Sequence, residues 1–104
     1  MKITFLGTGN AHAVDLYNTC FVITEGSENF LVDAGGGNGI LRQLRSAGID
    51  YRKIRTMFVT HNHTDHVLGA IWVIRKIGED IGNGLYEGNF YVYGNDLVIE
   101  YLKL

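Results

Sequence analysis

The chain has 104 residues, of which 46% are hydrophobic and 19% are charged. This composition is typical of one soluble globular domain and excludes a disordered or fibrous segment. A formal net charge of -2 gives no overall positive field that would recruit nucleic acid, although it leaves room for a local basic patch. A single cysteine excludes an internal disulfide, and no apolar run approaches the roughly 20 residues that span a bilayer. We therefore expect one cytoplasmic unit over residues 1–104, with no secretion signal and no membrane contact.

The residue pattern predicts a strand, a hairpin, a helix, a strand, a helix, a strand and a final helix. β-Branched and aromatic runs indicate the strands, and apolar residues three or four positions apart indicate the helices. This order favours an α/β or α+β sandwich. The predicted strands cover residues 2–6, 19–24, 30–34, 56–60 and 90–93, and the predicted helices cover about 38–48, 67–77 and 95–104.

Four metal-ligand residues follow the fourth predicted strand within six positions: His61, His63, Asp65 and His66. His61, His63 and Asp65 are spaced by two, so they project to one side if strand geometry persists past Thr60. His66 then points elsewhere and could serve a neighbouring metal. Imidazole and carboxylate ligands suit zinc, and manganese or iron is tolerated. Two such ions can activate a water for hydrolysis, so the group indicates a metal site rather than a polar loop that happens to contain histidines.

Several other residues invite a functional interpretation. His12 stands alone in a loop, where a surface or structural role is the commoner one. Asp33, at a strand end, could orient a metal-bound histidine or cap a turn, and the sequence leaves both readings open. Cys20 reads as a small core residue. The glycines of Gly7-Thr8-Gly9 and Gly35–Gly39 fail the dinucleotide fingerprint at its sixth position, so tight turns explain them better.

Three segments resemble the opening of metallo-β-lactamase-superfamily hydrolases, particularly the ribonuclease Z-like and phosphodiesterase-like branch. They are Phe5-Leu6-Gly7-Thr8-Gly9, Leu31-Val32-Asp33-Ala34-Gly35 and Val59-Thr60-His61-Asn62-His63-Thr64-Asp65-His66. The resemblance implies the N-terminal half of an αββα sandwich, with a dinuclear zinc site at the sheet edges. It further implies that His61 and His63 hold the first metal and that Asp65 and His66 hold the second. Asp65 would also be the catalytic group for proton transfer.

The chain departs from the family pattern after the histidine cluster. The family completes its site with a histidine, a bridging aspartate and another histidine, but no histidine follows His66 here. Asp80 and Asp96 fall in an expected loop and an expected helix cap, and we expect neither to bridge. The chain then holds half a site as part of a longer enzyme, and this piece alone would be inactive. Half a sandwich would also expose a sheet face through which copies self-associate as a homo-oligomer.

These observations favour a metal-dependent hydrolase acting on a small-molecule or RNA phosphodiester, with RNA 3′ processing as the most specific expectation. Thioester and sulfate-ester hydrolysis stay open, because one dinuclear core serves several substrates. The alternative from another class is a non-catalytic remnant or interaction module that keeps the fold. A partner chain that supplies the missing ligands is a further alternative.

Overall fold

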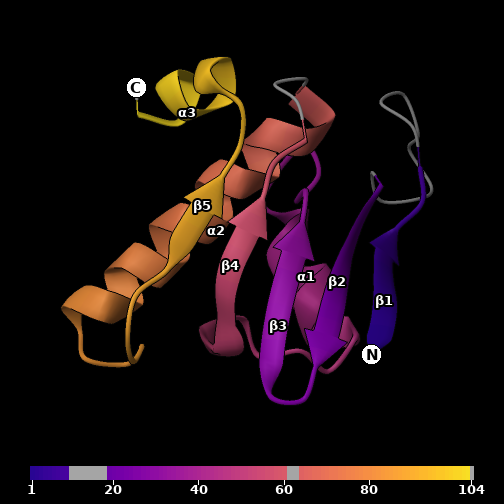
Figure 1. Cartoon of the computed structure of the whole chain (residues 1–104), viewed down its shortest axis with the longest axis vertical. Coiled ribbons are helices and arrows are strands. Elements are labelled where there is room, and N and C mark those ends of the chain that lie inside the picture. Colours follow the sequence, from indigo (N-terminus) through magenta and orange to yellow (C-terminus); the bar gives the residue numbers. More distant parts are fainter. Residues whose placement is uncertain (10–18, 61–63, 104) are drawn as a thin grey trace.

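A computed structural model of the chain describes residues 1–9, 19–60 and 64–103, without the side chains of residues 64–67 and 101. The strands form one five-stranded sheet in the order β1-β2-β3-β4-β5 (Figure 1). The described elements are β1 (Lys2–Gly7), β2 (Cys20–Glu25), β3 (Glu28–Val32), α1 (Gly39–Ser46), the 3-10 helix η1 (Tyr51–Lys53), β4 (Ile54–Phe58), α2 (Thr64–Gly82), β5 (Tyr91–Tyr93) and α3 (Asp96–Lys103).

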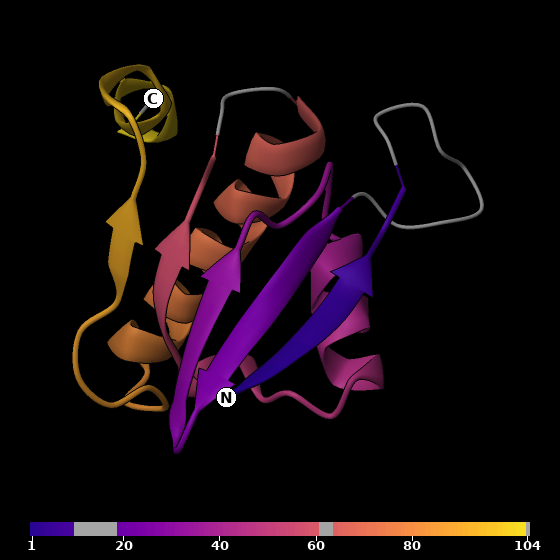
Figure 2. The same ribbon diagram turned by 45° about the vertical axis from the view of Figure 1, so that its right-hand side comes forward.

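The sheet is mixed, because its first three strands pair antiparallel and its last three pair parallel. Parallel neighbours need a long crossover, and α1 and α2 supply it between β3 and β4 and between β4 and β5. Both helices lie behind the sheet in Figures 1 and 2, so they cover the same face. The predicted element order and the α/β class are confirmed. Within the described parts of the chain, no helix is long and apolar enough to cross a membrane.

Two predicted boundaries around the histidine cluster are wrong. β4 ends at Phe58 and α2 begins at Thr64, so strand geometry does not persist to Asp65, whose backbone is helical. The argument that alternate strand positions bring Asp65 to the side of the histidines therefore fails. α2 also continues past Gly78, which was expected to stop it. A helical glycine costs only about 1 kcal/mol relative to alanine, and the buried neighbours Ile77 and Asp80 hold this turn in place.

The hydrophobic core lies between the sheet and the two helices. Strand residues alternate, so that every second side chain points toward α1 and α2. On β2, Cys20 and Val22 are fully buried, whereas the alternate residues Phe21 and Ile23 are partly exposed. The largest fully buried apolar side chains are Leu31, Ile40, Leu44, Ile54, Met57, Ile77, Val22, Val59, Val73 and Val98.

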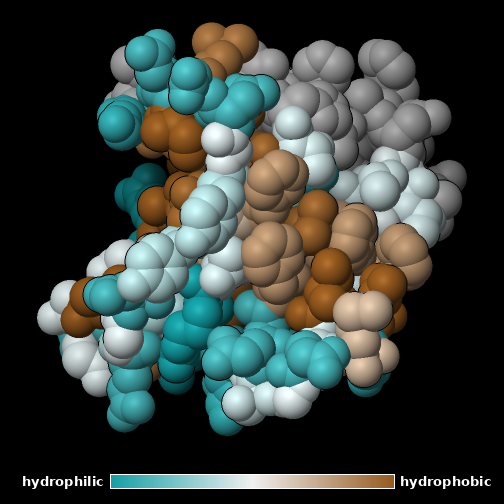
Figure 3. Space-filling model, viewed as in Figure 1, coloured by the Kyte–Doolittle hydropathy of each residue, from teal (hydrophilic) through white to brown (hydrophobic). Residues whose placement is uncertain are grey.

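The opposite face of the sheet is apolar and carries no helix among the described elements. Its side chains form brown and tan patches across the strands in Figure 3. The strand register aligns them in two rows, one of which runs from Phe5 through Phe21, Val32 and Phe58 to Tyr93. Phe5 is 63% exposed and Tyr93 is 54% exposed. A large exposed apolar surface of this kind is typical of an interaction face.

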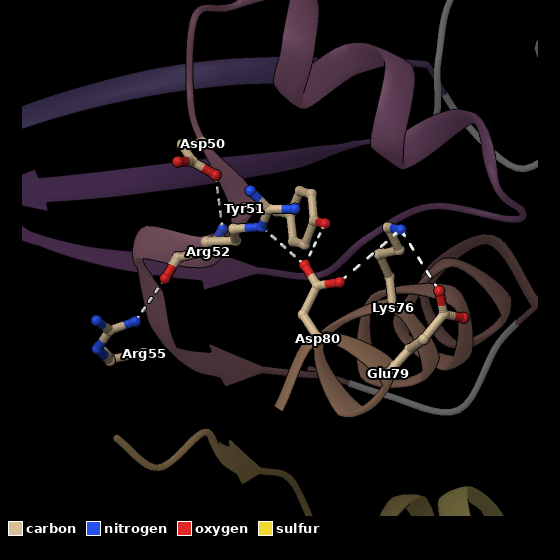
Figure 4. A network of polar contacts seen from close by, with 7 residues as sticks. All are labelled: Asp50, Tyr51, Arg52, Arg55, Lys76, Glu79 and Asp80. Carbon is tan, nitrogen blue, oxygen red and sulfur yellow. Dashed lines mark hydrogen bonds and ion pairs between the residues drawn. The ribbon is translucent and has the colours of Figure 1, made fainter. Parts of the chain in front are cut away.

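Asp80 ties the later part of α2 to the η1 turn (Figure 4). Its side chain is 2% exposed, and it accepts hydrogen bonds from the Tyr51 hydroxyl and from Arg52 Nε, the latter at 2.9 Å. Lys76 Nζ lies 4.0 Å from the second carboxylate oxygen. A buried carboxylate is stable only with such partners. Asp80 thus lies in a helix rather than in the expected loop, and its described contacts are structural.

Replacement of Asp80 by asparagine is expected to lower the urea midpoint at pH 7. The hydrogen bond from Arg52, and next that from Tyr51, holds the pKa of Asp80 below its ordinary value of 3.8. A lowered pKa stabilises the fold above the unfolded-state pKa, and this contribution is lost as the pH falls through the folded-state value. The difference in urea midpoint between the wild type and Asp80→Asn should therefore become smaller below about pH 4. Glu79→Gln, at a 62% exposed side chain, is the control, and equal midpoints for both variants at pH 7 would contradict the structural role.

Candidate metal centre

Asp33 anchors the chain immediately before the histidine cluster. It follows β3 and is the one non-glycine residue of the described chain with a positive φ, +57°, a conformation that aspartate adopts more readily than most residues. Its carboxylate accepts the Thr60 backbone N–H at 2.8 Å and the Thr60 hydroxyl at 2.7 Å. Its own N–H donates to the Phe58 carbonyl at 2.8 Å. Asp33 therefore holds the last described residue before His61.

Gly69 anchors the chain on the other side of the cluster. Its N–H donates to the Gly35 carbonyl at 2.7 Å. A Cβ placed on Gly69 would overlap the Ala34 carbonyl oxygen and lie 2.5 Å from the Ala34 carbonyl carbon. Only glycine permits this approach of a helix to a neighbouring backbone. The start of α2 is thus pressed directly onto the turn that follows β3.

The two anchors belong to one turn. Residues 33–35 hold Thr60 through the Asp33 carboxylate and hold Gly69 through the Gly35 carbonyl. The segment between Thr60 and Gly69 carries all four predicted ligand residues.

The predicted ligands are described to different extents. His61 and His63 lie outside the described residues, as does His12. Asp65 and His66 lie in the first turn of α2 by their backbone, while their side chains lie outside the description. Within the described part of the chain, no three His, Cys, Asp or Glu side chains come together as a possible metal site. The ligand assignment therefore remains a prediction.

Cys20 is not a nucleophile in this structure. Burial, and next the charge of Asp33, raises the pKa of its thiol to about 12. The reactive thiolate is therefore negligible near neutral pH. The interpretation of Cys20 as a core residue is confirmed by its full burial.

Asp80 and Asp96, the two later aspartates weighed as bridging ligands, both lie in helices. Asp80 lies fifteen positions after Asp65 on α2, and a rise of 1.5 Å per residue separates their backbones by about 22 Å. Asp96 opens α3, where the Asn95 side chain caps the helix by accepting the Val98 N–H at 2.8 Å. The position of Asp80 agrees with the expectation that it does not bridge the metals, and the same expectation for Asp96 stays a prediction.

Sequence reasoning missed Gly69 and left Asp33 open between two roles. The available signal for Gly69 was an isolated glycine inside an apolar helical run, which often marks a close backbone contact. The described hydrogen bonds of Asp33 show that it caps a neighbouring strand end, because Thr60 supplies two donors to it, and a role in orienting a histidine stays a prediction. No local pattern could have paired residues 27 positions apart.

A match to a known protein family shows to which family the chain belongs. The model of the family described as Anti-Pycsar protein Apyc1 matches residues 1–77. The chain belongs to this family. The match covers β1 through most of α2, and so it includes both anchors and the whole histidine cluster of this Apyc1-family chain.

The Apyc1-family chain is also similar to curated proteins named Ribonuclease Z. It is 32% identical to the protein of Pyrococcus furiosus over 117 aligned positions, which cover 95% of this chain and 37% of that protein. It is 38% identical to the protein of Methanothermobacter thermautotrophicus over 79 residues, which cover 75% of this chain and 25% of the relative. The chain therefore spans about a quarter to two fifths of the length of these relatives.

Solved structures confirm the metallo-β-lactamase fold. A diphosphatase from the PhnP family matches 97% of this chain and 44% of its own with a TM-score of 0.78 at 20% identity. The metallo-β-lactamase-fold protein YhfI from Bacillus subtilis matches 95% of this chain and 39% of its own with a TM-score of 0.75 at 24% identity. Human tRNase Z, short form, gives a TM-score of 0.66 at 24% identity over 90% of this chain and 43% of its own. The five strands and two covering helices of the Apyc1-family chain thus form part of that fold.

Proposed function

We propose that the protein containing this chain is a metal-dependent hydrolase of phosphodiesters. The observation that carries the proposal is the turn at residues 33–35, which holds both ends of a segment rich in metal-ligand residues. A structural loop does not need three histidines and an aspartate between two rigid anchors. A site for a metal ion needs both the ligands and the rigidity.

The donor set of this segment fits zinc-class ions. His61 and His63 would hold a first ion, and Asp65 and His66 would hold a second, with manganese or iron as less suited occupants. When bound, such ions lower the pKa of a coordinated water and offset charge on phosphoryl oxygens. The complete centre would take up to two ions, with the remaining ligands supplied by the part of the protein outside these 104 residues.

The residues of the chain itself would position and move protons. The Asp65 backbone lies in the first turn of α2. Asp65 is the proposed catalytic residue for proton transfer, because a positioned carboxylate can take up and return a proton. Asp33 and Gly69 are proposed as positioning residues, because their described contacts hold the backbone on either side of the cluster.

RNA is the proposed substrate class within the phosphodiesters. The relatives with 32% and 38% identity carry the name Ribonuclease Z, and the matched human structure is a tRNase Z. RNA 3′ processing is accordingly the most specific activity that we propose. The small-molecule phosphodiesters form the alternative within the same chemistry.

A substrate panel tests the proposal on the full-length protein. We expect turnover of an RNA with a 3′ extension and of bis(p-nitrophenyl) phosphate, loss of both with a chelator, and recovery with added zinc. A thioester and an aryl sulfate serve as comparison substrates with unrelated leaving groups. Turnover that survives chelation, or that is confined to the thioester or the sulfate, would overturn the phosphodiesterase assignment.

The second candidate is a non-catalytic module that associates through the apolar sheet face. The motivating observation is the exposure of Phe5, Phe58 and Tyr93 on a face without a helix among the described elements. We propose that residues 1–104 form one folded unit and that isolated copies self-associate through this face. In sedimentation velocity, Phe5→Glu should shift the 104-residue chain toward monomer, whereas Ile81→Glu, at an equally apolar and 45% exposed position on α2, should not. A compact wild-type monomer at about 100 µM would contradict this association.

A further inference from the structure

The charges of the chain are segregated along the sequence. Seven of the nine lysine and arginine residues lie between Arg42 and Lys76, whereas only two of the eleven acidic residues, Asp50 and Asp65, do. Although the net charge of the whole chain is -2, the stretch from Arg42 to Lys76 is basic and the rest of the chain is acidic. This stretch forms α1, η1, β4 and much of α2.

The fold gathers five of these basic side chains around two neighbouring hollows. The first hollow, of about 440 Å³, is lined by Arg52, Lys53 and Arg55. The second, of about 430 Å³, is lined by Arg45 and Lys76, and Asp50 lines both. We call these five residues the basic surface. It lies where β4 begins, at the opposite end of that strand from Thr60 and the histidine cluster.

Several cationic groups of the basic surface are held in place before any ligand arrives. The Arg55 guanidinium lies 4.6 Å from the centre of the Tyr86 ring and donates to the Arg52 carbonyl at 2.6 Å (Figure 4 shows the arginines). The Arg52 guanidinium is fixed by Asp80, and Lys76 Nζ lies 5.9 Å from the centre of the Tyr51 ring. A guanidinium carries five N–H donors, so one such bond leaves others for an anion. Side chains ordered in advance lose little entropy on binding.

Acidic residues limit what this surface can accept. Glu28 and Glu87 line the first hollow beside the arginines, and Asp50 lines both hollows. A compact anion buried inside either hollow would meet these carboxylates. An extended chain of phosphates can instead lie across the rims, where the exposed Arg45 and Lys53 side chains stand. Among the described ion pairs, none involves Arg45 or Lys53.

We propose that the basic surface binds the phosphate backbone of RNA, away from the histidine cluster. The choice of RNA among polyanions rests on the proposed phosphodiesterase function. Contacts to phosphates carry no base preference, so the surface would hold a substrate without reading its sequence. Its affinity should fall steeply with salt, because each phosphate contact releases counterions.

Binding of a fluorescein-labelled RNA hairpin, followed by anisotropy in EDTA, tests the proposal without any hydrolysis. The Arg45→Glu/Lys53→Glu variant should raise the Kd at least about tenfold and reduce the slope of log Kd against log salt by about 2, one for each lost phosphate contact. The matched control is Lys2→Glu/Lys103→Glu, which reverses two exposed cations outside the basic stretch and should leave both values nearly unchanged. Circular dichroism verifies that both variants fold.

Two outcomes would overturn the proposal. Equal weakening by both variants would mean that net charge alone governs binding. Equal competition by polyglutamate and by unlabelled RNA would point to an acidic protein as the ligand. In the full-length protein, the Arg45→Glu/Lys53→Glu variant should retain hydrolysis of bis(p-nitrophenyl) phosphate. The two proposals can therefore fail separately. If only the RNA-binding proposal is wrong, the wild type still hydrolyses bis(p-nitrophenyl) phosphate. If the phosphodiesterase proposal is wrong, the wild type does not hydrolyse it.

Discussion

Asp65→Asn in the full-length protein is expected to reduce phosphodiester hydrolysis by about a thousandfold or more. Asparagine keeps the shape of the side chain but removes its charge and its ability to take up a proton. Proton transfer by a positioned carboxylate contributes about 10²- to 10⁴-fold, and the loss of an anionic metal ligand adds to this effect. His63→Ala should have a comparable effect through the other proposed metal position.

Initial rates on bis(p-nitrophenyl) phosphate, with zinc in excess, measure these losses. The control is Asp96→Asn, which makes the same chemical change at an exposed position in the first turn of α3. Both aspartates lie at the start of a helix, so a general effect on helix dipoles would lower both rates equally. Wild-type rates in Asp65→Asn or His63→Ala would remove these residues from the catalytic site.

Gly69→Ala is expected to destabilise the chain by at least about 3 kcal/mol, at the upper end of the range for an overpacked core. The added methyl group would overlap the Ala34 carbonyl oxygen and lie 2.7 Å from the Gly35 carbonyl oxygen. Backbone atoms cannot rotate away as a flexible side chain can. The start of α2 must therefore move off the 33–35 turn, and the segment that carries the histidines must move with it.

Gly78→Ala provides the matched control within the same helix. Nothing lies within 4 Å of a Cβ at Gly78, so alanine should stabilise α2 by about 0.5 to 1 kcal/mol through its helix propensity. Urea unfolding followed by circular dichroism should give midpoints that move in opposite directions. If Gly69→Ala fails to fold at all while Gly78→Ala folds, that loss is the extreme form of the expected destabilisation. Equal midpoints for the two alanine variants would contradict the close contact.

The order of the elements could be predicted from sequence because each element repeats its apolar residues with its own period. The alternating run at residues 2–6 and the β-branched runs at 19–24 and 30–34 all became strands. Glycine proved a poor guide to helix ends. It stopped α1 near Gly48 but not α2 at Gly78, because burial of Ile77 and Asp80 outweighs the propensity cost. The short η1 helix also escaped prediction, since it depends on one capping bond from the Arg52 N–H to Asp50.

The ligand residues could be predicted because four of them crowd into six positions. Their support could not, since it depends on contacts between distant segments. Asp33 is hydrogen-bonded to Thr60, 27 positions later in the sequence, and Gly69 is hydrogen-bonded to Gly35, 34 positions earlier. Both contacts exist only once β3 and β4 pair in parallel and α2 packs behind them. Period-two spacing was also the wrong argument for Asp65, because a helix begins between the histidines and that residue.

The metal content of the full-length protein tests the metal assignment most directly. Purified wild type, loaded with zinc and dialysed, should retain between one and two zinc ions per chain by inductively coupled plasma mass spectrometry. His63→Ala and Asp65→Asn should each retain fewer, whereas Asp96→Asn should match the wild type. Metal-free wild-type protein after loading, or undiminished zinc in both ligand variants, would contradict a metal centre at residues 61–66.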